Sequence, residues 1–151
     1  YHLGQVLVAK DDVIIIDFEG EPSRSLAERR AKHSPLRDVV GMLRSFDYAA
    51  HAALRQATAD GTCNRAELWP YLGDWEQQSR AAFLDGYVAA VGDSTGYPAD
   101  PDQMKVLLAL FTLEKACYEL RYELDNRPDW VEIPLGGLRE LLSLEAKDAP
   151  R

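Results

Sequence analysis

Residues 1–20 of the chain read YHLGQVLVAKDDVIIIDFEG, and this stretch decides how the N-terminal part folds. Two apolar runs, Val6–Ala9 and Val13–Ile16, flank a polar turn. Branched apolar residues on both sides of a polar turn are typical of a β-hairpin. The sequence therefore predicts a hairpin that runs from Gln5 to Asp17.

The open end of this hairpin would carry polar side chains from both strands. Strand pairing would bring Gln5 close to Asp17 and Glu19, so that an amide oxygen and two carboxylates share one end. Oxygen ligands of this kind suit Mg²⁺. We therefore expect Gln5, Asp17 and Glu19 to bind a magnesium ion. The alternative is an ordinary surface hairpin with an acidic end.

The spacing of these residues also matches a phosphoryl-transfer pattern. Protein kinases place a catalytic Asp five residues before a metal-binding Asn, and an Asp-Phe-Gly segment follows on the next strand. In this chain Gln5 would hold the Asn position and Asp17 the metal-binding Asp position. The catalytic base is then expected just before Tyr1, so no residue of the chain itself is assigned that role. His2 would brace the loop by hydrogen bonds.

Beyond this spacing, the segments YHLGQVL and IIIDFEGEP resemble the bacterial maltokinases, which occur free or fused to trehalose synthase. These enzymes are among the aminoglycoside-phosphotransferase-like kinases. The similarity continues through SPLRDVVGMLRSFDYAA to LEKACYELRYELDNRPDW. In that family the loop reads His-Gly-Asp-x-His-x-Gly-Gln, and this chain holds the part from the first x onward. The resemblance implies a partial C-terminal lobe of a protein-kinase-like fold, with the His-Gly-Asp and the nucleotide-binding lobe upstream.

The resemblance also implies a function. ATP and maltose would give maltose 1-phosphate and ADP, as part of trehalose to glycogen and α-glucan metabolism in the cytoplasm. ATP would be the cosubstrate, Mg²⁺ the metal, and a fused or associated trehalose synthase the protein partner. The isolated chain is expected to be inactive. Two alternatives remain: a kinase for another small molecule, such as an amino sugar or an aminoglycoside-like compound, and a non-catalytic helical interaction module of a trehalose synthase fusion.

The composition indicates a single globular domain over the 151 residues, with 46% hydrophobic and 28% charged residues. Acidic residues outnumber Lys and Arg by 25 to 17, and without a basic stripe no nucleic-acid partner is expected. No apolar run is long enough for a membrane span, and no signal peptide is visible. Cys63 and Cys117 lack zinc-site spacing, so we expect buried or idle thiols in a reducing compartment.

Helical periodicity dominates the rest of the chain, so the fold class is expected to be mainly α with an N-terminal β-hairpin. The segment after the hairpin is expected to be a loop with one helical turn at residues 26–31. Ser34, Asn64 and Asp100 are candidate N-caps. The expected helices span about residues 35–57, 65–91, 101–125 and 134–145.

The helix expected at residues 101–125 begins apolar on two faces, which predicts burial between neighbours. One face holds Met104, Leu107, Leu108 and Phe111, and the other holds Val106, Leu110 and Leu113. Without an upstream lobe, some apolar surface is expected to be exposed, and self-association through that surface is one way to cover it.

The first of these two faces continues toward the C-terminus as Glu114, Tyr118 and Tyr122. Sugars require hydrogen-bonding groups for their hydroxyls and aromatic faces for their C–H surfaces. We therefore expect Glu114, Tyr118 and Tyr122 to bind the sugar, with Arg127 one turn further on. The alternative is that both tyrosines are core residues and that Glu114 pairs with a basic residue of the same helix.

Overall fold

The computed structural model describes residues 1–18, 20, 25–92, 94, 97–98 and 100–148. As expected, this part of the chain is mainly helical with one N-terminal hairpin. Within it, no helix combines the length and the apolar character needed to cross a membrane. The elements in chain order are η1 (Leu3–Gln5), β1 (Val6–Ala9), β2 (Asp12–Ile15), α1 (Leu26–Arg30), α2 (Leu36–Thr58), α3 (Arg65–Val91), α4 (Pro101–Asn126), η2 (Pro128–Trp130) and α5 (Glu132–Asp148).

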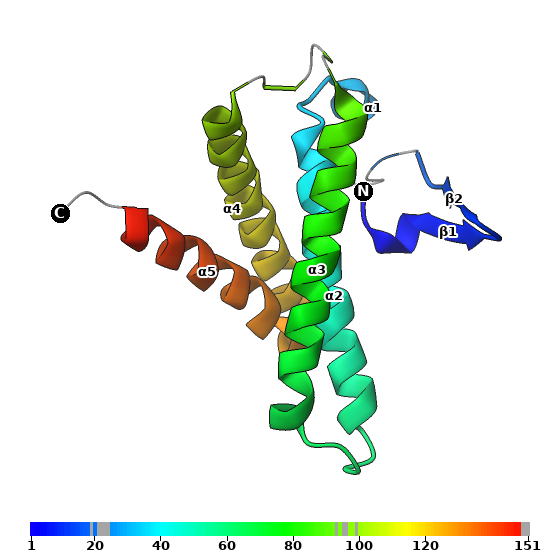
Figure 1. The fold of residues 1–151 in the computed structure, drawn as a ribbon, viewed down its shortest axis with the longest axis vertical. Helices are drawn as coiled ribbons and strands as arrows, with labels where there is room; N and C mark the ends of the chain where they lie inside the picture. Colours follow the sequence, from blue (N-terminus) through cyan, green and yellow to red (C-terminus); the bar gives the residue numbers. More distant parts are fainter. Residues whose placement is uncertain (19, 21–24, 93, 95–96, 99, 149–151) are drawn as a thin grey trace.

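Helix α2 is the central element, and α3 and α4 each pack along it (Figure 1). Apolar residues recur along α2 with the helical period, so one broad stripe can face both neighbours. The buried hydrophobic residues of α2 are Leu36, Val39, Val40, Met42, Leu43, Ala50 and Leu54. The residues of α3 and α4 that pack against the first turns of this stripe are Phe83, Leu84, Tyr87, Leu107, Leu108 and Phe111.

The helices begin where short polar side chains can accept hydrogen bonds from backbone N–H groups. Asn64 and Asp100 cap α3 and α4, each accepting a bond of 2.9 Å from the first turn. Helix α2 begins one residue later than the range expected from sequence, at Leu36, whose N–H donates to Ser34 Oγ at 3.3 Å. Helix α5 begins earlier than expected, at Glu132.

One apolar face of α4 is exposed, so the expectation that both faces are buried is wrong. Val106 is 67% exposed, Leu110 54% and Leu113 47%. Hydrophobic periodicity shows that a face is apolar but not whether a neighbouring element reaches it. Cys63 and Cys117 are both free and exposed, so of the two expected alternatives, buried or idle thiols, burial is wrong.

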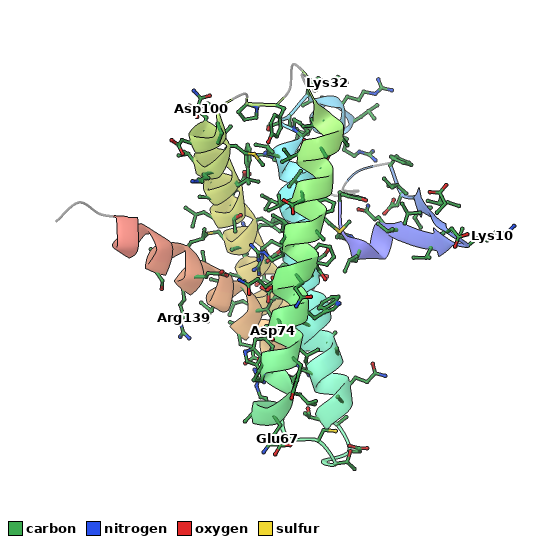
Figure 2. All side chains as sticks on the ribbon, viewed as in Figure 1. Lys10, Lys32, Glu67, Asp74, Asp100 and Arg139 are labelled. Atoms are coloured by element: carbon green, nitrogen blue, oxygen red, sulfur yellow. The ribbon has the colours of Figure 1, made fainter. Side chains whose placement is uncertain are left out.

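The hairpin stands out from the helices and joins them through η1 (Figure 1). Its strands are antiparallel, with Val6 opposite Ile15, and Lys10 lies at the far tip (Figure 2). Two strands alone cover little apolar surface. Val8 and Val13 are accordingly exposed.

Close backbone contact fixes the N-terminal turn on α2. A Cβ atom at Gly41 would overlap the carbonyl oxygen of Tyr1. One turn further along α2, Ser45 Oγ accepts a hydrogen bond of 3.1 Å from the backbone N–H of Leu3. Glycine at position 41 therefore lets the N-terminal backbone lie directly on α2.

We predict that Gly41→Ala lowers the free energy of unfolding by about 1–3 kcal/mol, because the added methyl group must displace Tyr1. The matched control is Gly86→Ala on α3, where nothing lies within 4 Å of the added Cβ. This control should raise stability by ~0.5–1 kcal/mol through helix propensity alone. Urea unfolding of both variants checks the pair, and equal shifts would contradict the close contact.

Candidate functional site

Gln5 and Asp17, two of the residues expected to bind metal, lie side by side at the open end of the hairpin. Gln5 Nε2 donates to Asp17 Oδ2 at 3.3 Å and to the Asp17 carbonyl oxygen at 3.2 Å. Gln5 Oε1 accepts a bond of 3.2 Å from the backbone N–H of His2. The backbone of Asp17 has a φ of 62°, in the left-handed region that non-glycine residues adopt infrequently. Glu19, the third expected ligand, lies outside the described residues.

His2 stabilises the turn that leads into the hairpin. Its Nδ1 accepts a hydrogen bond of 3.1 Å from the backbone N–H of Gly4, and it acts as the N-cap of η1. The reciprocal bond, which Gln5 Oε1 accepts from the His2 backbone N–H, completes a capping box. Hydrogen bonds of His2 thus brace the loop, as expected, and they orient Gln5 at the same time.

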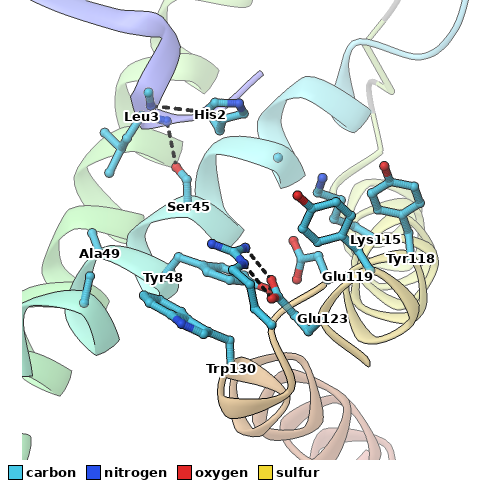
Figure 3. A pocket seen from close by; sticks show the side chains of 15 residues that line it. His2, Leu3, Ser45, Tyr48, Ala49, Lys115, Tyr118, Glu119, Glu123 and Trp130 are labelled. Carbon is cyan, nitrogen blue, oxygen red and sulfur yellow. Dashed lines mark hydrogen bonds and ion pairs between the residues drawn. The ribbon is translucent and has the colours of Figure 1, made fainter. Parts of the chain in front are cut away.

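A pocket of about 640 Å³ lies between this turn, α2, the C-terminal half of α4 and η2 (Figure 3). Because the turn that lines the pocket continues into Gln5, the pocket and the candidate metal site are neighbours. The lining residues are His2, Leu3, Gly4, Gly41, Ser45, Tyr48, Ala49, Ala52, Lys115, Tyr118, Glu119, Tyr122, Glu123, Arg127 and Trp130.

Glu123 is a buried carboxylate of the pocket, with 1% of its surface exposed. Tyr48 Oη donates to Glu123 Oε1 at 2.9 Å. Arg127 donates through Nε to Oε2 at 2.9 Å and through Nη2 to Oε1 at 2.6 Å (Figure 3). Burial, together with the carboxylates of Glu119 and Glu123, raises the pKa of Tyr48, so the phenol stays protonated and remains a donor.

Glu119 lies one turn before Glu123 on α4 and is also buried. Arg44 on α2 donates through Nε to Glu119 Oε2 at 2.9 Å, and its Nη2 lies 2.8 Å from the same oxygen. Burial raises the pKa of Glu119, and the positive charge of Arg44 opposes that rise. Only 2% of Arg44 is exposed, so this ion pair is shielded from water.

Aromatic rings form much of the remaining wall. Tyr48 and Trp130 stack with their ring centroids 6.2 Å apart. The Arg127 guanidinium lies over Tyr122 at 5.5 Å and over Trp130 at 5.1 Å, which are cation–π distances. Tyr118 and Tyr122 remain half-exposed, so their rings and hydroxyls are accessible from the pocket.

The structure brings together three of the four residues expected to bind substrate. Tyr118, Tyr122 and Arg127 line the pocket, whereas Glu114 is not among the described lining residues. Both carboxylate oxygens of Glu114 lie 2.7 Å from Arg37 Nη2 on α2. Glu114 therefore has a basic partner on another helix.

Sequence reasoning missed the two carboxylates at the centre of the pocket. Ala116, Glu119 and Glu123 are the buried residues of α4, and their spacing of three and four residues places them on one face. The available signal was this spacing beside Tyr118 and Tyr122. Charged residues in a helix are rarely buried without partners, so the spacing alone favoured a solvated face.

Comparison with known proteins shows similarity to sugar kinases over nearly the whole chain. A solved glucosamine kinase in complex with glucosamine, ADP and inorganic phosphate has a TM-score of 0.78 and 26% identity, covering 98% of this chain and 35% of that one. A second glucosamine kinase structure, crystal form B, has a TM-score of 0.77 and 25% identity, covering 96% and 33%. The helices and the hairpin thus form part of a kinase-like fold.

Two curated relatives are glucosamine kinases as well. The protein of Streptacidiphilus jiangxiensis is 28% identical over 98% of this chain and 32% of its own length. The protein of Mycolicibacterium smegmatis is 31% identical over 93% of this chain and 33% of its own length. The chain therefore spans about one third of the length of these relatives. No protein-family model matches the chain.

We predict that Arg127→Met lowers the free energy of unfolding by about 1–3 kcal/mol, because the buried Glu123 carboxylate loses two of its donors. The control is Arg65→Met, which removes an ion pair with Glu132 whose partners are both about half exposed. Such exposed pairs contribute about 0–1 kcal/mol. Thermal and urea unfolding would measure both variants, and an equally small loss in each would show that Glu123 does not depend on Arg127.

Proposed function

We propose that this chain forms the acceptor pocket and part of the metal site of a kinase that transfers a phosphoryl group from ATP to an amino sugar, with glucosamine as the first candidate. The observation that carries the proposal is the pair of buried carboxylates, Glu119 and Glu123, in a pocket next to the Gln5–Asp17 pair. The relatives support the amino-sugar alternative over maltokinase, since those described above are glucosamine kinases.

The acceptor argument rests on charge. An ammonium group that leaves water needs a carboxylate partner, whereas a neutral sugar requires only hydrogen-bonding groups. Glu123 receives donors on both oxygens. Glu119 receives the Arg44 bond on Oε2, and within the described residues no hydrogen bond reaches its Oε1. Glu119 is therefore the carboxylate with an oxygen available to a ligand ammonium.

The aromatic walls complement this charge. Tyr118 and Tyr122 offer half-exposed rings and hydroxyls, and Trp130 offers a ring beside Arg127. Sugar rings present C–H faces that pack on aromatic side chains and hydroxyls that bond to polar groups. We therefore assign Tyr118, Tyr122 and Arg127 to sugar binding. Glu114 is a less direct candidate because Arg37 holds its carboxylate.

We place the Mg²⁺ of the proposed kinase at the hairpin end, where Asp17 offers a carboxylate. Mg²⁺ in kinases is bound by one or two protein oxygen ligands, by water and by substrate phosphates, and it neutralises charge that develops on the transferred group. Asp17 supplies a carboxylate, and Glu19 is a further candidate. Gln5 faces Asp17 with Nε2, while its Oε1 accepts from the His2 backbone N–H, so the Gln5 amide would have to turn over to act as a ligand. Both His2 and the left-handed backbone at Asp17 hold these groups in place.

The remaining contributions of the chain are orientation and exclusion of water. The pocket wall formed by His2, Leu3 and Gly4 would place the sugar hydroxyl next to the phosphates held at Gln5 and Asp17. Positioning of this kind is the main requirement of phosphoryl transfer. The expectation of a catalytic base just before Tyr1 stays a prediction.

Other expectations from the sequence stay predictions. Maltose as acceptor, a fused or associated trehalose synthase and a role in α-glucan metabolism receive no support from the relatives described above. A cytoplasmic location, self-association through exposed lobe surface and inactivity of the isolated chain are likewise untested.

The proposal is tested by measuring ADP formation from ATP with glucosamine, glucose and maltose, in the protein that carries this chain. We expect glucosamine to give the highest kcat/KM. Glu119→Gln keeps the shape of the side chain but removes its charge. Because hydrogen bonds to charged groups contribute ~1.5–3 kcal/mol, its KM for glucosamine should rise roughly ten-fold or more with the KM for ATP unchanged. Higher efficiency with maltose, or no turnover of glucosamine, would refute the amino-sugar assignment.

For the metal site, we predict that Asp17→Asn removes most kinase activity while the fold is retained. Asn tolerates the left-handed backbone at this position, so the substitution mainly removes a charge. A metal ion at the reacting phosphates stabilises the transition state by several kcal/mol. Asp11→Asn, at the hairpin tip, is the control and should remain fully active. Near-normal turnover of Asp17→Asn in Mg²⁺ would show that Asp17 is not a metal ligand.

A further inference from the structure

We infer that Arg44 is a positioning residue for the acceptor: it keeps the Glu119 carboxylate ionised and turned toward the pocket, and through Glu119 it sets the preference for an ammonium-bearing sugar. The inference rests on the proposed function, because it explains how the pocket recognises the amino group. Among the described residues that line the pocket, Glu119 is present and Arg44 is not. Arg44 would therefore act on the ligand only through Glu119.

The Arg44 guanidinium contacts two carboxylates, one on each side: Glu119 and Asp47. Nε donates to Glu119 Oε2 at 2.9 Å, and Nη2 lies 2.8 Å from the same oxygen as an ion-pair contact without hydrogen-bond geometry. Nη1 donates to Asp47 Oδ2 at 2.6 Å. Because both contacts with Glu119 fall on the same oxygen, Arg44 makes no hydrogen bond or ion pair to Oε1. A planar guanidinium fixes such an arrangement, whereas a lysine ammonium does not.

The guanidinium itself has little freedom to move. The ring of Tyr48 lies 5.9 Å from its Cζ atom. On its other neighbour, α5, a Cβ atom at Gly137 would come within 2.5 Å of Nη1. Arg44 from α2 is thus confined by its own helix, by α4 and by α5. The side chains of a surface ion pair remain mobile in solvent, whereas the Arg44 guanidinium is enclosed by the three helices.

The charges around Glu119 come from three segments. From α2, Glu119 faces Arg44, Asp47 and the Tyr48 phenol. From α4 it faces Lys115, and the Glu123–Arg127 ion pair lines the same pocket. The N-terminal turn contributes His2 to that pocket. Burial and Asp47 favour the protonated carboxyl, while Arg44 and Lys115 favour the ionised form. Removal of Arg44 therefore raises the pKa of Glu119 further. A protonated Glu119 carries no negative charge and can no longer pair with the ammonium group of a ligand.

Asp47 has a second neighbour, His51, which carries a positive charge when it is protonated, so the network extends away from the pocket. His51 Nδ1 lies 3.3 Å from Asp47 Oδ1, one turn along α2. Burial lowers the pKa of His51, but its hydrogen bonds to Asp47 outweigh burial and leave the pKa raised. Asp47 is 19% exposed and pairs with His51 when that ring is protonated, whereas Glu119 is 9% exposed, so Glu119 is the carboxylate more dependent on Arg44.

The experiment uses Arg44→Met, Arg44→Lys and Gly137→Ala in the protein that carries this chain. Arg80→Met is the matched control, since Arg80 pairs with Glu76 at 3.0 Å in a half-buried i,i+4 pair on α3, outside the pocket lining. Two quantities are measured for each variant: the titration midpoint of the Glu119 carboxyl by carbon NMR, and the dissociation constants of glucosamine, glucose and ATP by calorimetry from pH 5 to 8. Gly137→Ala displaces the guanidinium without removing it, so the question remains answerable if Arg44→Met does not fold.

We expect Arg44→Met to raise the Glu119 midpoint and to weaken glucosamine binding about ten-fold or more near neutral pH. The loss should grow as the pH falls, while glucose and ATP binding stay within about two-fold. Arg44→Lys should restore the midpoint more than the affinity, because it keeps the charge but not the planar fork. Gly137→Ala should weaken glucosamine binding selectively, and Arg80→Met should leave all three ligands unchanged.

Two results would overturn the inference. An unmoved Glu119 midpoint in Arg44→Met would show that Arg44 does not control its ionisation. Parallel losses for glucosamine, glucose and ATP, in step with a lower melting temperature, would show a purely structural role. If the unmodified protein binds glucosamine no better than glucose, the proposed substrate is wrong, and the Glu119 titration then still decides whether Arg44 holds the carboxylate.

Discussion

The burial of one guanidinium, that of Arg44, constrains the rest of this structure. A buried cation is costly unless carboxylates pair with it, so α4 must turn Glu119 inward and α2 must supply Asp47. The same requirement fixes how α5 crosses the bundle, because only a residue without a side chain fits beside Nη1 at position 137. The fold therefore has a charged centre where α2, α4 and α5 meet, and the pocket lies directly against it. Removing one partner of such a group is far more destabilising than replacing the whole group by apolar residues.

Helix α4 links this charged centre to the hydrophobic core. Its first half packs Leu107, Leu108 and Phe111 against the start of α2, so the position of the helix is set by apolar burial. Its second half turns Glu119 and Glu123 inward and carries Tyr118 and Tyr122 at the pocket. Because α4 is one continuous helix, the packing of its first half also fixes the position of the side chains on its second half, which would contact a sugar. Groups held on a rigid helix are better oriented for recognition than groups on a loop.

The features of this arrangement that depend on residues close together in the chain could be predicted from the sequence. The hairpin could be predicted because its register depends on two short apolar runs, and that register places Gln5 near Asp17. The inward turn of Glu119 and Glu123 could not be predicted, because their partners Arg44 and Tyr48 lie 75 residues away in each case. The same holds for Glu114, whose partner Arg37 is 77 residues away. A helical pattern assigns charged residues to solvent by default, and only the tertiary partner reverses that assignment. The prediction that both apolar faces of α4 are buried was wrong for a related reason. Hydrophobic periodicity shows that a face is apolar but not whether another element packs against it.

The two buried carboxylates, Glu119 and Glu123, differ in which of their oxygens accept hydrogen bonds from the protein, and we expect their roles to differ accordingly. Glu123 accepts bonds on both oxygens from Tyr48 and from a half-exposed Arg127, so its charge is already neutralised within the protein. Glu119 accepts its hydrogen bond from Arg44 on one oxygen. A ligand ammonium that approached Glu123 would have to compete with Arg127, whereas one that approached Glu119 would add a second cation to a carboxylate with an available lone pair. Glu123 therefore shapes the pocket by holding Arg127 against Tyr122 and Trp130. In the function proposed above, Glu119 is the group whose charge would distinguish an amino sugar from a neutral one.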